Sequence, residues 1–344
     1  MDILNILNTI RDNNSNEYKE RIPEANRNNL EEIRYAMIDG DNIMVANEFM
    51  STLLNKLVKS VVHVKRFSNP LKPLKKGNKP LGDTIEEIYN NFIKGSEFDA
   101  LGSKLMTRSL PDTKTVYHRM NYQLQYPITV SRETLSRAFA SYDALEKYIN
   151  DVINQLFNSA ELDEFANMKE LLASALNKGA VKTVKVANPL TSEANGKSFI
   201  KAVKTTSGLM AFPSTEWNGY LTAQTTDDKP ITTFSRKSEQ ILILDTPVDT
   251  SVAVDVLAST FNMSVADFND TRKIVIDVFP KVEGKYVHAM LIDEAFIQMY
   301  DDLFTVTSFE NGQGLYRNYW LNVWQTQAYS ILVNAVAFYS EETA

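Results

Sequence analysis

The stretch VYHRMNYQLQYPITV, residues 116–130, alternates apolar and polar side chains and is the most informative segment of the chain. Even positions carry mostly apolar groups, including Val116, Tyr122 and Val130, whereas most odd positions are polar. A period of two over this length predicts a single β-strand of about 50 Å, about three times the usual length. A strand that long would extend beyond its own domain, so we expect another copy of the chain to cover it. The pattern favours assembly over catalysis.

The odd-numbered side chains of this strand are candidates for contact with a neighbouring copy: Tyr117, Arg119, Asn121 and Gln123. Pro127 has no N–H to donate, which places the far end of the strand at a sheet edge or a bulge. Residues 95–115 contain two glycines and a proline without a clear period, and they predict a long excursion that returns through the strand. Before them, DTIEEIYNNFI (83–93) has apolar residues at helical spacing and predicts a helix.

A long amphipathic helix is predicted directly after the strand. Ser131 is a good N-cap, and Glu133 favours the positive end of the helix dipole. Apolar residues then recur every three or four positions from 135 to 156, a stripe about 39 Å long. A second stripe, residues 162–176, ends at Gly179, and the pattern leaves open whether the two stripes form one bent helix or two.

The second half alternates predicted strands and helices. Strands are expected at 181–186, 241–244 and 273–279, and helical segments at 199–203 and 250–261. The dipeptide Asn311-Gly312 is a hairpin signal inside a β-rich tail. At the other end of the chain, Ile3, Leu7 and Ile10 share one helical face and predict a short helix that docks onto the protein.

Composition narrows the class of protein. The chain has 344 residues, 44% hydrophobic and 23% charged, which is ordinary for a soluble globular protein. The absence of cysteine excludes disulfides and thiolate metal sites and fits a reducing cytosol. A net charge of −7 argues against wholesale coating of nucleic acid. We expect no membrane segment and no secretory signal.

Charge is unevenly distributed along the chain. Between Phe49 and Gly82 there is no acidic residue, but there are eight basic residues and three prolines. We expect this segment to be extended and mobile until it docks. A solvated loop is the simplest interpretation, an arm that pairs with an acidic neighbouring copy is the sharper one, and binding to DNA phosphates comes third. Candidate inter-subunit contacts of the arm are Lys65, Arg66, Lys72, Lys75, Lys76 and Lys79.

A search for catalytic chemistry returns little. The sequence contains no phosphate-binding glycine loop and no nucleophile elbow. The histidines (His63, His118, His288) lack metal-ligand spacing, and His118 is expected to be packed and hydrogen-bonded. Adjacent carboxylates are expected to be solvated: Glu86-Glu87, Asp293-Glu294 and Asp301-Asp302. We therefore predict no catalytic residue, no cofactor and no metal site.

Several segments together carry a resemblance to a known family. They are the arm FSNPLKPLKKGNKPLGDTIEEI, the excursion and strand PDTKTVYHRMNYQLQYPITVSR, the helix ETLSRAFASYDALEKYINDVINQLF, the segments ILILDTPVDTSVAVDVLASTFNM and KIVIDVFP, and the closing FENGQGLYRNYWLNVWQTQAYSILVNAVAF. The layout resembles the major capsid proteins of tailed bacteriophages, in the version found in small phages of low-GC Gram-positive hosts. The resemblance covers nearly the whole chain and consists of layout patterns without a catalytic signature.

The resemblance implies an α+β fold of the tailed-phage and herpesvirus major capsid type. Its expected parts are an N-terminal arm (1–80), an extended loop with the long return strand (81–130), a peripheral domain with the spine helix (131–186), an axial domain (187–297) and C-terminal strands returning to the peripheral domain (298–344). Some relatives form lysine–asparagine isopeptide bonds or append an immunoglobulin-like domain. The sequence identifies no such residue pair and no obvious domain of that kind.

The function implied by the resemblance is structural and not enzymatic. Hexamers and pentamers of the chain would form an icosahedral head that encloses double-stranded DNA, assembled in the host bacterial cytoplasm and retained in the virion. Expected partners are other copies of the chain, scaffold and portal proteins and the packaged DNA, but no membrane. Two alternatives remain: another virion or tail structural protein, and a cytosolic enzyme with an unrecognised site within 187–290.

Overall fold

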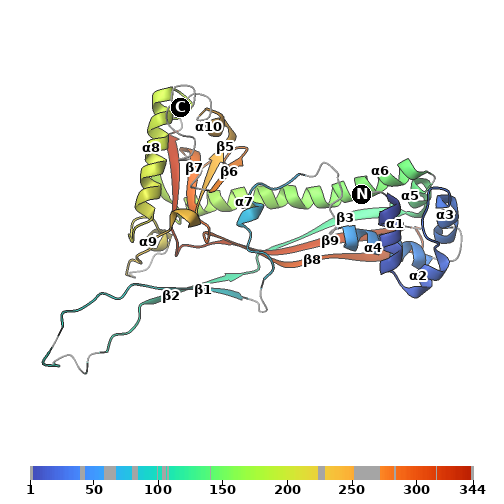
Figure 1. Cartoon of the computed structure of the whole chain (residues 1–344), viewed down its shortest axis with the longest axis horizontal. Coiled ribbons are helices and arrows are strands. Elements are labelled where there is room, and N and C mark those ends of the chain that lie inside the picture. The colour runs from blue at the N-terminus through green and yellow to red at the C-terminus, as the bar shows by residue number, and fades with distance from the viewer. Residues whose placement is uncertain are drawn as a thin grey trace. The chain divides into compact units, whose positions relative to one another are not determined.

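A computed structural model shows the protein as a mixture of helices and sheets (Figure 1). The structure describes residues 3–38, 43–57, 67–79, 84–98, 100–102, 106, 108–139, 141–223, 229–251, 272–282, 284–314 and 316–341. Backbone contacts divide the chain into two compact units. Unit 1 comprises Met1–Asn69, Tyr122–Glu164 and Asp301–Gln325, and unit 2 comprises Pro70–Asn121, Phe165–Tyr300 and Thr326–Ala344.

Unit 1 is built on the three-stranded sheet β3-β9-β8. Its strands are β3 (Tyr122–Ser131), β9 (Tyr316–Tyr329) and β8 (Ile297–Asn311), of which β8 and β9 also contribute residues to unit 2. β3 pairs antiparallel with β9 from Tyr122↔Gln325 to Ser131↔Tyr316. β3 is an edge strand, so the predicted edge position of Pro127 is confirmed. The predicted turn at Asn311-Gly312 is confirmed as the link between β8 and β9.

Helices bury a single apolar core in unit 1. They are α1 (Ile3–Asn13), α2 (Asn16–Arg21), α3 (Leu30–Ile38), α4 (Ile43–Leu57), α5 (Arg132–Ala138) and α6 (Tyr142–Ile153). Phe49 of α4 and Phe139 are completely buried, with ring centroids 5.4 Å apart. Ile10 of α1 is 1% exposed and joins this core, together with Leu321 of β9. The predicted N-terminal docking helix is therefore confirmed, because its apolar face is removed from water.

The long helix predicted after Ser131 is interrupted. Ser131 is the N-cap, because its side chain accepts a hydrogen bond from the Thr134 N–H. However, α5 ends at Ala138, and Ser141 then caps α6 by accepting from the Ala144 N–H at 3.2 Å. A single helix over the first stripe is thus wrong, because a second cap begins a new helix inside it.

After that break, the rest of the first stripe and the whole second stripe lie on one helical run. α6 continues through a π-helical segment (Asn154–Asn158) into α7 (Ser159–Asn177). The run ends at Gly179, whose φ of +74° is favourable for glycine and not for other residues.

Unit 2 contains a five-stranded sheet in the order β4-β10-β7-β5-β6. The strands are β4 (Lys182–Lys185), β10 (Ala335–Glu341), β7 (Lys285–Asp293), β5 (Gln240–Asp245) and β6 (Arg272–Ile276). β4 and β10 run parallel, as do β5 and β6, and the other pairs are antiparallel. The strands predicted near 181, 241 and 273 are confirmed.

Short and long helices accompany this sheet. Helix α8 (Glu193–Met210) packs on it, with Phe199, Leu291 and Phe338 almost fully buried in a shared core. The shorter helices are α9 (Tyr220–Ala223), α10 (Thr246–Ser251) and the 3-10 turns Lys72–Leu74 and Lys237–Glu239. Most of the helix expected at 250–261 lies outside the described residues. The α+β class is confirmed, whereas the five-part domain division stays a prediction.

The single 50 Å strand is wrong. The alternating stretch forms two strands, β2 (Thr113–Arg119) and β3, separated at Met120 and Asn121. β2 pairs with β1 and β3 pairs with β9, in different sheets, so both strands find partners within their own chain. The alternation itself is correct, since His118 and Val130 are buried and the odd positions from 113 to 129 are exposed. A two-residue break keeps the period of two, which is why the sequence pattern did not reveal it.

The helix predicted at 83–93 is also wrong, because Thr84–Asn90 forms strand β1. Isoleucines at positions 85 and 88 and a tyrosine at 89 fit a helical spacing, but they are equally favourable in strands. Pairing with β2 over seven residues decides between the two, from Thr84↔Arg119 to Asn90↔Thr113. Tertiary pairing therefore overrides the local helical pattern.

Asp245 and His288 are buried ionisable residues of the unit 2 sheet. Asp245, at the end of β5, accepts a hydrogen bond from the Val248 N–H at 3.0 Å, and its burial raises the pKa of the carboxyl to about 6. His288 of β7 lies 2.8 Å from the Ser340 hydroxyl, and its burial lowers the pKa of the imidazole to about 4. Both shifts have one cause, because burial penalises the charged form of each group.

We predict that these two residues have opposite effects on stability between pH 4 and pH 6.5. The Asp245 contribution is complete below its ordinary pKa of 3.8 and is lost as the pH rises through about 6. The His288 contribution is complete above its ordinary 6.5 and is lost as the pH falls toward 4. Asp245→Asn, which mimics the neutral carboxyl, should therefore leave unfolding unchanged at the acidic end and make it harder toward pH 6.5, whereas His288→Phe should make it harder at the acidic end. Urea unfolding across this pH range measures both slopes, and equal slopes in the two variants would contradict the assignment.

Candidate assembly surface

The most exposed part of unit 2 is the excursion between β1 and β2. These strands form an isolated antiparallel ribbon of two strands (Figure 1). The described residues that connect them, 91–98, 100–102, 106 and 108–112, are in neither helix nor strand. The predicted excursion is confirmed, and its return limb begins at Thr113.

A half-buried carboxylate holds the inner face of the ribbon. Glu87 of β1 has a side chain 18% exposed, and its Oε2 lies 3.1 Å from His118 Nε2 on β2. Ser330 donates its hydroxyl hydrogen to the other carboxylate oxygen of Glu87. The expectation that His118 is packed and hydrogen-bonded is confirmed, whereas the expectation that Glu87 is solvated is wrong. Glu87 links both strands of the ribbon to the segment that follows β9.

The base of the ribbon is held by a second set of contacts. Tyr89 donates its hydroxyl hydrogen to the Thr232 carbonyl, and burial raises the pKa of this tyrosine. The Asn91 amide donates to the Pro230 carbonyl at 3.1 Å and accepts from the Thr232 N–H at 3.2 Å. The ring of Phe92 lies 6.3 Å from that of Phe234. The ribbon therefore leaves unit 2 from a defined base.

Beyond this base, large apolar side chains are presented to solvent. Their exposed fractions are 83% for Ile93, 94% for Phe98, 95% for Leu101, 92% for Met106 and 85% for Leu110. Burying one such side chain is worth about 1.5–3 kcal/mol, so each is held in water at a cost. Large apolar side chains exposed along one segment are typical of surfaces that bind another protein. We define these five residues as the apolar tip of the excursion.

The four residues predicted to contact a neighbour along the strand are divided by the break. Tyr117 and Arg119 lie on the exposed face of β2, and Gln123 lies on the exposed face of β3. Tyr117 donates to Glu86 Oε1 at 3.1 Å. Asn121 lies at the break itself, where its side-chain amide forms two 2.8 Å hydrogen bonds with the backbone of Gln327. Their role between subunits stays a prediction.

The basic segment is folded where the structure describes it. Residues Lys72–Leu74 form a 3-10 turn in which the leucine is 3% exposed, and the preceding Leu71 is fully buried. Lys76 is held by unit 2, because its backbone N–H donates to the Met299 carbonyl and its Nζ donates to the Glu294 carbonyl at 2.8 Å. The expectation of an extended, mobile arm is wrong here, because the two leucines bury this segment against its own chain.

The six basic residues predicted for the arm therefore differ in their surroundings. Lys65 and Arg66 lie outside the described residues. Lys72 is exposed and Lys75 and Lys79 are half-buried, whereas Lys76 makes the intramolecular contacts above. The turn holds Lys72 at the surface of unit 2. That a neighbouring copy binds these basic side chains stays a prediction.

No convergent catalytic site is found among the described residues. They contain no group of three or more histidine, cysteine or carboxylate side chains that could hold a metal ion. They also contain no helix long and apolar enough to cross a membrane. Asp293 does not match the expectation of a solvated carboxylate: it is 7% exposed, burial raises its pKa, and it accepts from the Ser235 hydroxyl at 2.5 Å. Asp293 is therefore a buried carboxylate of the core, and the Ser235 hydroxyl supplies it with a hydrogen-bond donor.

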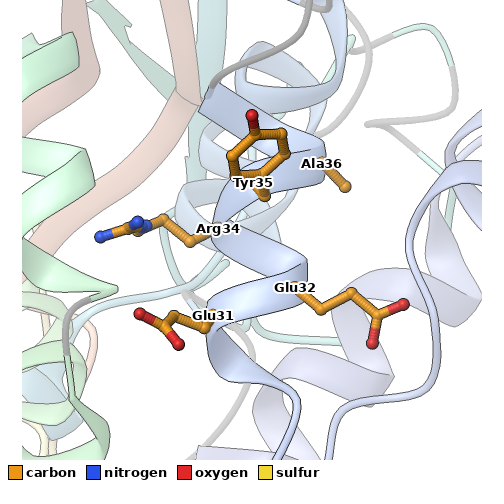
Figure 2. A pocket seen from close by; sticks show the side chains of 5 residues that line it. All are labelled: Glu31, Glu32, Arg34, Tyr35 and Ala36. Atoms are coloured by element: carbon orange, nitrogen blue, oxygen red, sulfur yellow. The ribbon is translucent and has the colours of Figure 1, made fainter.

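A surface hollow of about 530 Å³ lies on helix α3 (Figure 2). Its described lining residues are Glu31, Glu32, Arg34, Tyr35 and Ala36, all from that one helix. Figure 2 shows the carboxyl groups of Glu31 and Glu32 pointing to opposite sides of the helix. Side chains that diverge in this way do not focus on one reacting atom, so the hollow has no catalytic geometry.

Sequence reasoning missed the residues that define the candidate surface. Phe98, Leu101, Met106 and Leu110 stand among glycine, serine and charged residues. Large apolar side chains in a segment without period have no inner face to occupy, and this signal could have identified them. The contact between Glu87 and His118 joins residues 31 positions apart. A pattern among neighbouring residues cannot predict such a contact.

Comparison with solved structures identifies the class of protein to which the fold belongs. The fold is similar to the capsid structure of Staphylococcus phage Andhra, with a TM-score of 0.65 at 14% identity over 83% of this chain and 87% of that one. It is also similar to a structure of bacteriophage P68 described as "head fiber and inner core protein gp22", with a TM-score of 0.64 at 13% identity over 81% and 86% of the two chains. The chain therefore has the fold of tailed-phage capsid proteins, the HK97-like fold.

The family follows from sequence comparison. Residues 7–339 match the family described as "Phi29-like phage major capsid protein". The chain is 34% identical over 339 residues to the major capsid protein of Bacillus phage PZA. This match covers 97% of this chain and 72% of that protein. It is 26% identical to the major capsid protein of Streptococcus phage Cp-1, over 98% and 94% of the two chains. The chain belongs to the Phi29-like phage major capsid protein family, and it is a structural component of the virion.

We predict that Glu87 holds the ribbon in place. Glu87→Ala removes two hydrogen bonds and leaves the buried His118 nitrogen unsatisfied, which costs about 1–3 kcal/mol locally. Amides of β1 and β2 should then exchange with deuterium about tenfold faster or more, while amides of α8 keep their protection. Glu86→Ala is the matched control, because Glu86 is exposed and its carboxylate bonds to Tyr117 on the outer face of the ribbon. Equal exchange in the two variants would show that Glu87 is not the anchor.

Proposed function

We propose that the chain assembles into hexamers and pentamers that form an icosahedral head around double-stranded DNA. The observation that carries this proposal is the apolar tip, with exposed fractions between 83% and 95% on a ribbon fixed at its base. A tip of one copy that docks on a different surface of the next copy is a heterologous contact. Contacts of this kind close into rings when the rotation between copies closes. Family membership supports the same conclusion.

The expected parts of the chain have distinct places in this proposal. The axial segment, 187–297, lies at the centre of each ring, and the peripheral segment, 131–186, lies farther out. The excursion extends over the adjacent copy and buries the apolar tip there. The exposed positions Tyr117, Arg119, Asn121 and Gln123 contribute polar contacts along the same interface. Extended interfaces of this type supply stability to a shell through area more than through any single contact.

Assembly partners follow from the same proposal. The head is built in the host bacterial cytoplasm with scaffold and portal proteins, and DNA is packaged inside it. A net charge of −7 is compatible with an inner wall that does not grip the packaged genome. The chain then has a structural role and no enzymatic one.

The basic segment supplies a second contact between copies. Lys72 and Lys75 flank buried leucines on a short turn, so their positions are fixed before assembly. The chain outside residues 49–82 carries the negative charge and offers an acidic surface on a neighbouring copy. Fixed charges lose little conformational freedom on binding, which strengthens the contact.

We predict that charging the apolar tip abolishes assembly without unfolding the chain. Phe98→Asp or Leu101→Asp replaces an exposed apolar side chain, so the unassembled chain keeps its structure. Burial of that side chain against a neighbouring copy is worth about 1.5–3 kcal/mol at each interface, and a closed shell repeats it in every copy. Electron microscopy and sedimentation of the assembly reaction should show few or no particles, and circular dichroism should be unchanged.

Two controls accompany this test. Phe98→Leu keeps an apolar group at the tip and should keep particle yield. Ser96→Asp adds the same charge at an exposed neighbouring position and should also assemble. Full particle yield from both Phe98→Asp and Leu101→Asp would overturn the role of the tip.

We predict that charge reversal of the arm lowers particle yield. The double variant Lys72→Glu and Lys75→Glu leaves the buried leucines and the Lys76 contacts in place, and circular dichroism checks that the fold persists. Assembly of the unaltered chain should also weaken as salt is added, because screening acts on exposed charges. The control reverses two exposed lysines elsewhere in unit 2, Lys178 and Lys201, and should retain assembly. Equal particle yield in both double variants would remove the arm from the mechanism.

A further inference from the structure

The chain contains three Asn-Gly dipeptides, at Asn195, Asn218 and Asn311. Asn-Gly is chemically special because glycine has no side chain to keep its backbone nitrogen away from the preceding amide. That nitrogen can attack the side-chain carbonyl carbon and expel ammonia. The structure places the three dipeptides in different surroundings, and these surroundings decide which of them can react.

The turn between β8 and β9 surrounds the Asn311 amide with reactive geometry. Its carbonyl oxygen Oδ1 accepts hydrogen bonds from two backbone N–H groups, those of Gln313 at 3.1 Å and Gly314 at 3.0 Å. Two N–H donors on one carbonyl oxygen stabilise the negative charge that develops when its carbon is attacked. They also fix the amide orientation, since an N–H cannot donate to the NH2 group.

The departing nitrogen of the same amide meets a hydroxyl. Asn311 Nδ2 donates to the Tyr316 hydroxyl oxygen at 2.8 Å. Once the amide carbon becomes tetrahedral, its nitrogen gains a lone pair, and the same contact can reverse so that the tyrosine donates a proton to it. The Tyr316 ring lies against the turn: a Cβ atom added at Gly314 would be only 2.3 Å from this ring. Gly312 itself is exposed, so solvent base reaches its N–H.

The other two dipeptides lack this arrangement. Gly196 is buried in the first turn of α8, where its N–H donates to the Ser192 carbonyl at 3.0 Å and is not free to attack. Gly219 is buried, and the buried Asn218 amide is held by its donation to the Ile231 carbonyl at 3.0 Å and to the Thr233 hydroxyl at 3.1 Å, away from solvent base. The chain thus carries two internal controls.

We propose that Asn311 is a self-modifying site that converts to aspartate without an enzyme. Solvent base removes the Gly312 N–H proton, the nitrogen bonds to the Asn311 side-chain carbonyl carbon, and the bond from that carbon to Nδ2 breaks. Ammonia leaves with a proton from Tyr316, which solvent replaces, and a five-membered imide remains. Water then opens the imide to aspartate or isoaspartate, so no oxidant or reductant is needed.

The turn accommodates the aspartate product. A carboxylate at position 311 keeps both backbone N–H donors, and these bonds become stronger because the acceptor is charged. The Tyr316 hydroxyl can donate to the new oxygen. Each converted copy gains one negative charge next to Glu310, whose carboxylate lies 4.0 Å from Arg317. The arginine offsets part of the added repulsion.

The test compares the three sites in the full chain. Purified protein is incubated in mildly alkaline buffer, folded or in urea, and its peptides are analysed by mass spectrometry for conversion at each asparagine. We expect Asn311 to react at least as fast in the folded chain as in urea, and Asn195 and Asn218 to react only in urea. Slower conversion of Asn311 in the folded chain than in urea would overturn the proposal, because the turn would then protect the amide.

A variant tests the proton donor. Tyr316→Phe should slow Asn311 conversion several-fold in the folded chain and leave its rate in urea unchanged. Circular dichroism shows whether the variant folds. Gly314→Ala serves as a second variant, because it displaces the tyrosine ring while keeping the hydroxyl, and it should slow the reaction in the same way. Unchanged folded-state rates in both variants would remove Tyr316 from the mechanism.

Discussion

A two-stranded β-ribbon has no interior, so it holds its position only through the contacts at its base. In this chain those contacts are made by Glu87, Tyr89 and Asn91, and each reaches a segment far away in the sequence. The apolar tip depends on them, because its five side chains are each between 83% and 95% exposed. The ribbon can therefore present large apolar side chains to water while its base remains fixed.

This arrangement separates what folds the chain from what assembles it. Two compact cores, around Phe139 in unit 1 and Phe338 in unit 2, remove apolar surface from water within one copy. The apolar tip does the opposite and leaves apolar surface exposed, which a neighbouring copy would bury in the proposed assembly. A protein built in this way needs no convergent pocket, and the diverging side chains on α3 agree with that. Such a protein interacts with other molecules through its exposed surfaces.

Local patterns predicted local features well. Ser131 as a cap, the Asn311-Gly312 turn and the buried strand of 241–244 all follow from residues close in sequence. The two errors in strand assignment came from distant pairing: Thr84–Asn90 became a strand because β2 lies beside it, and the alternation after 113 changed sheets without losing its period. The alternation identified the exposed faces correctly. It could not identify the partners, because partners depend on the fold of the whole chain.

The two proposed contact regions differ in how much order they have before assembly. Lys72 sits on a turn already fixed by buried leucines, so little freedom is lost when it pairs. The side chains of the apolar tip are almost fully exposed, so immobilising them against a neighbouring copy costs side-chain freedom at every interface. That cost keeps each contact weak, and weak contacts dissociate fast enough for misplaced copies to be released. In the proposed shell, closure then depends on the number of contacts made together, which favours complete particles over fragments.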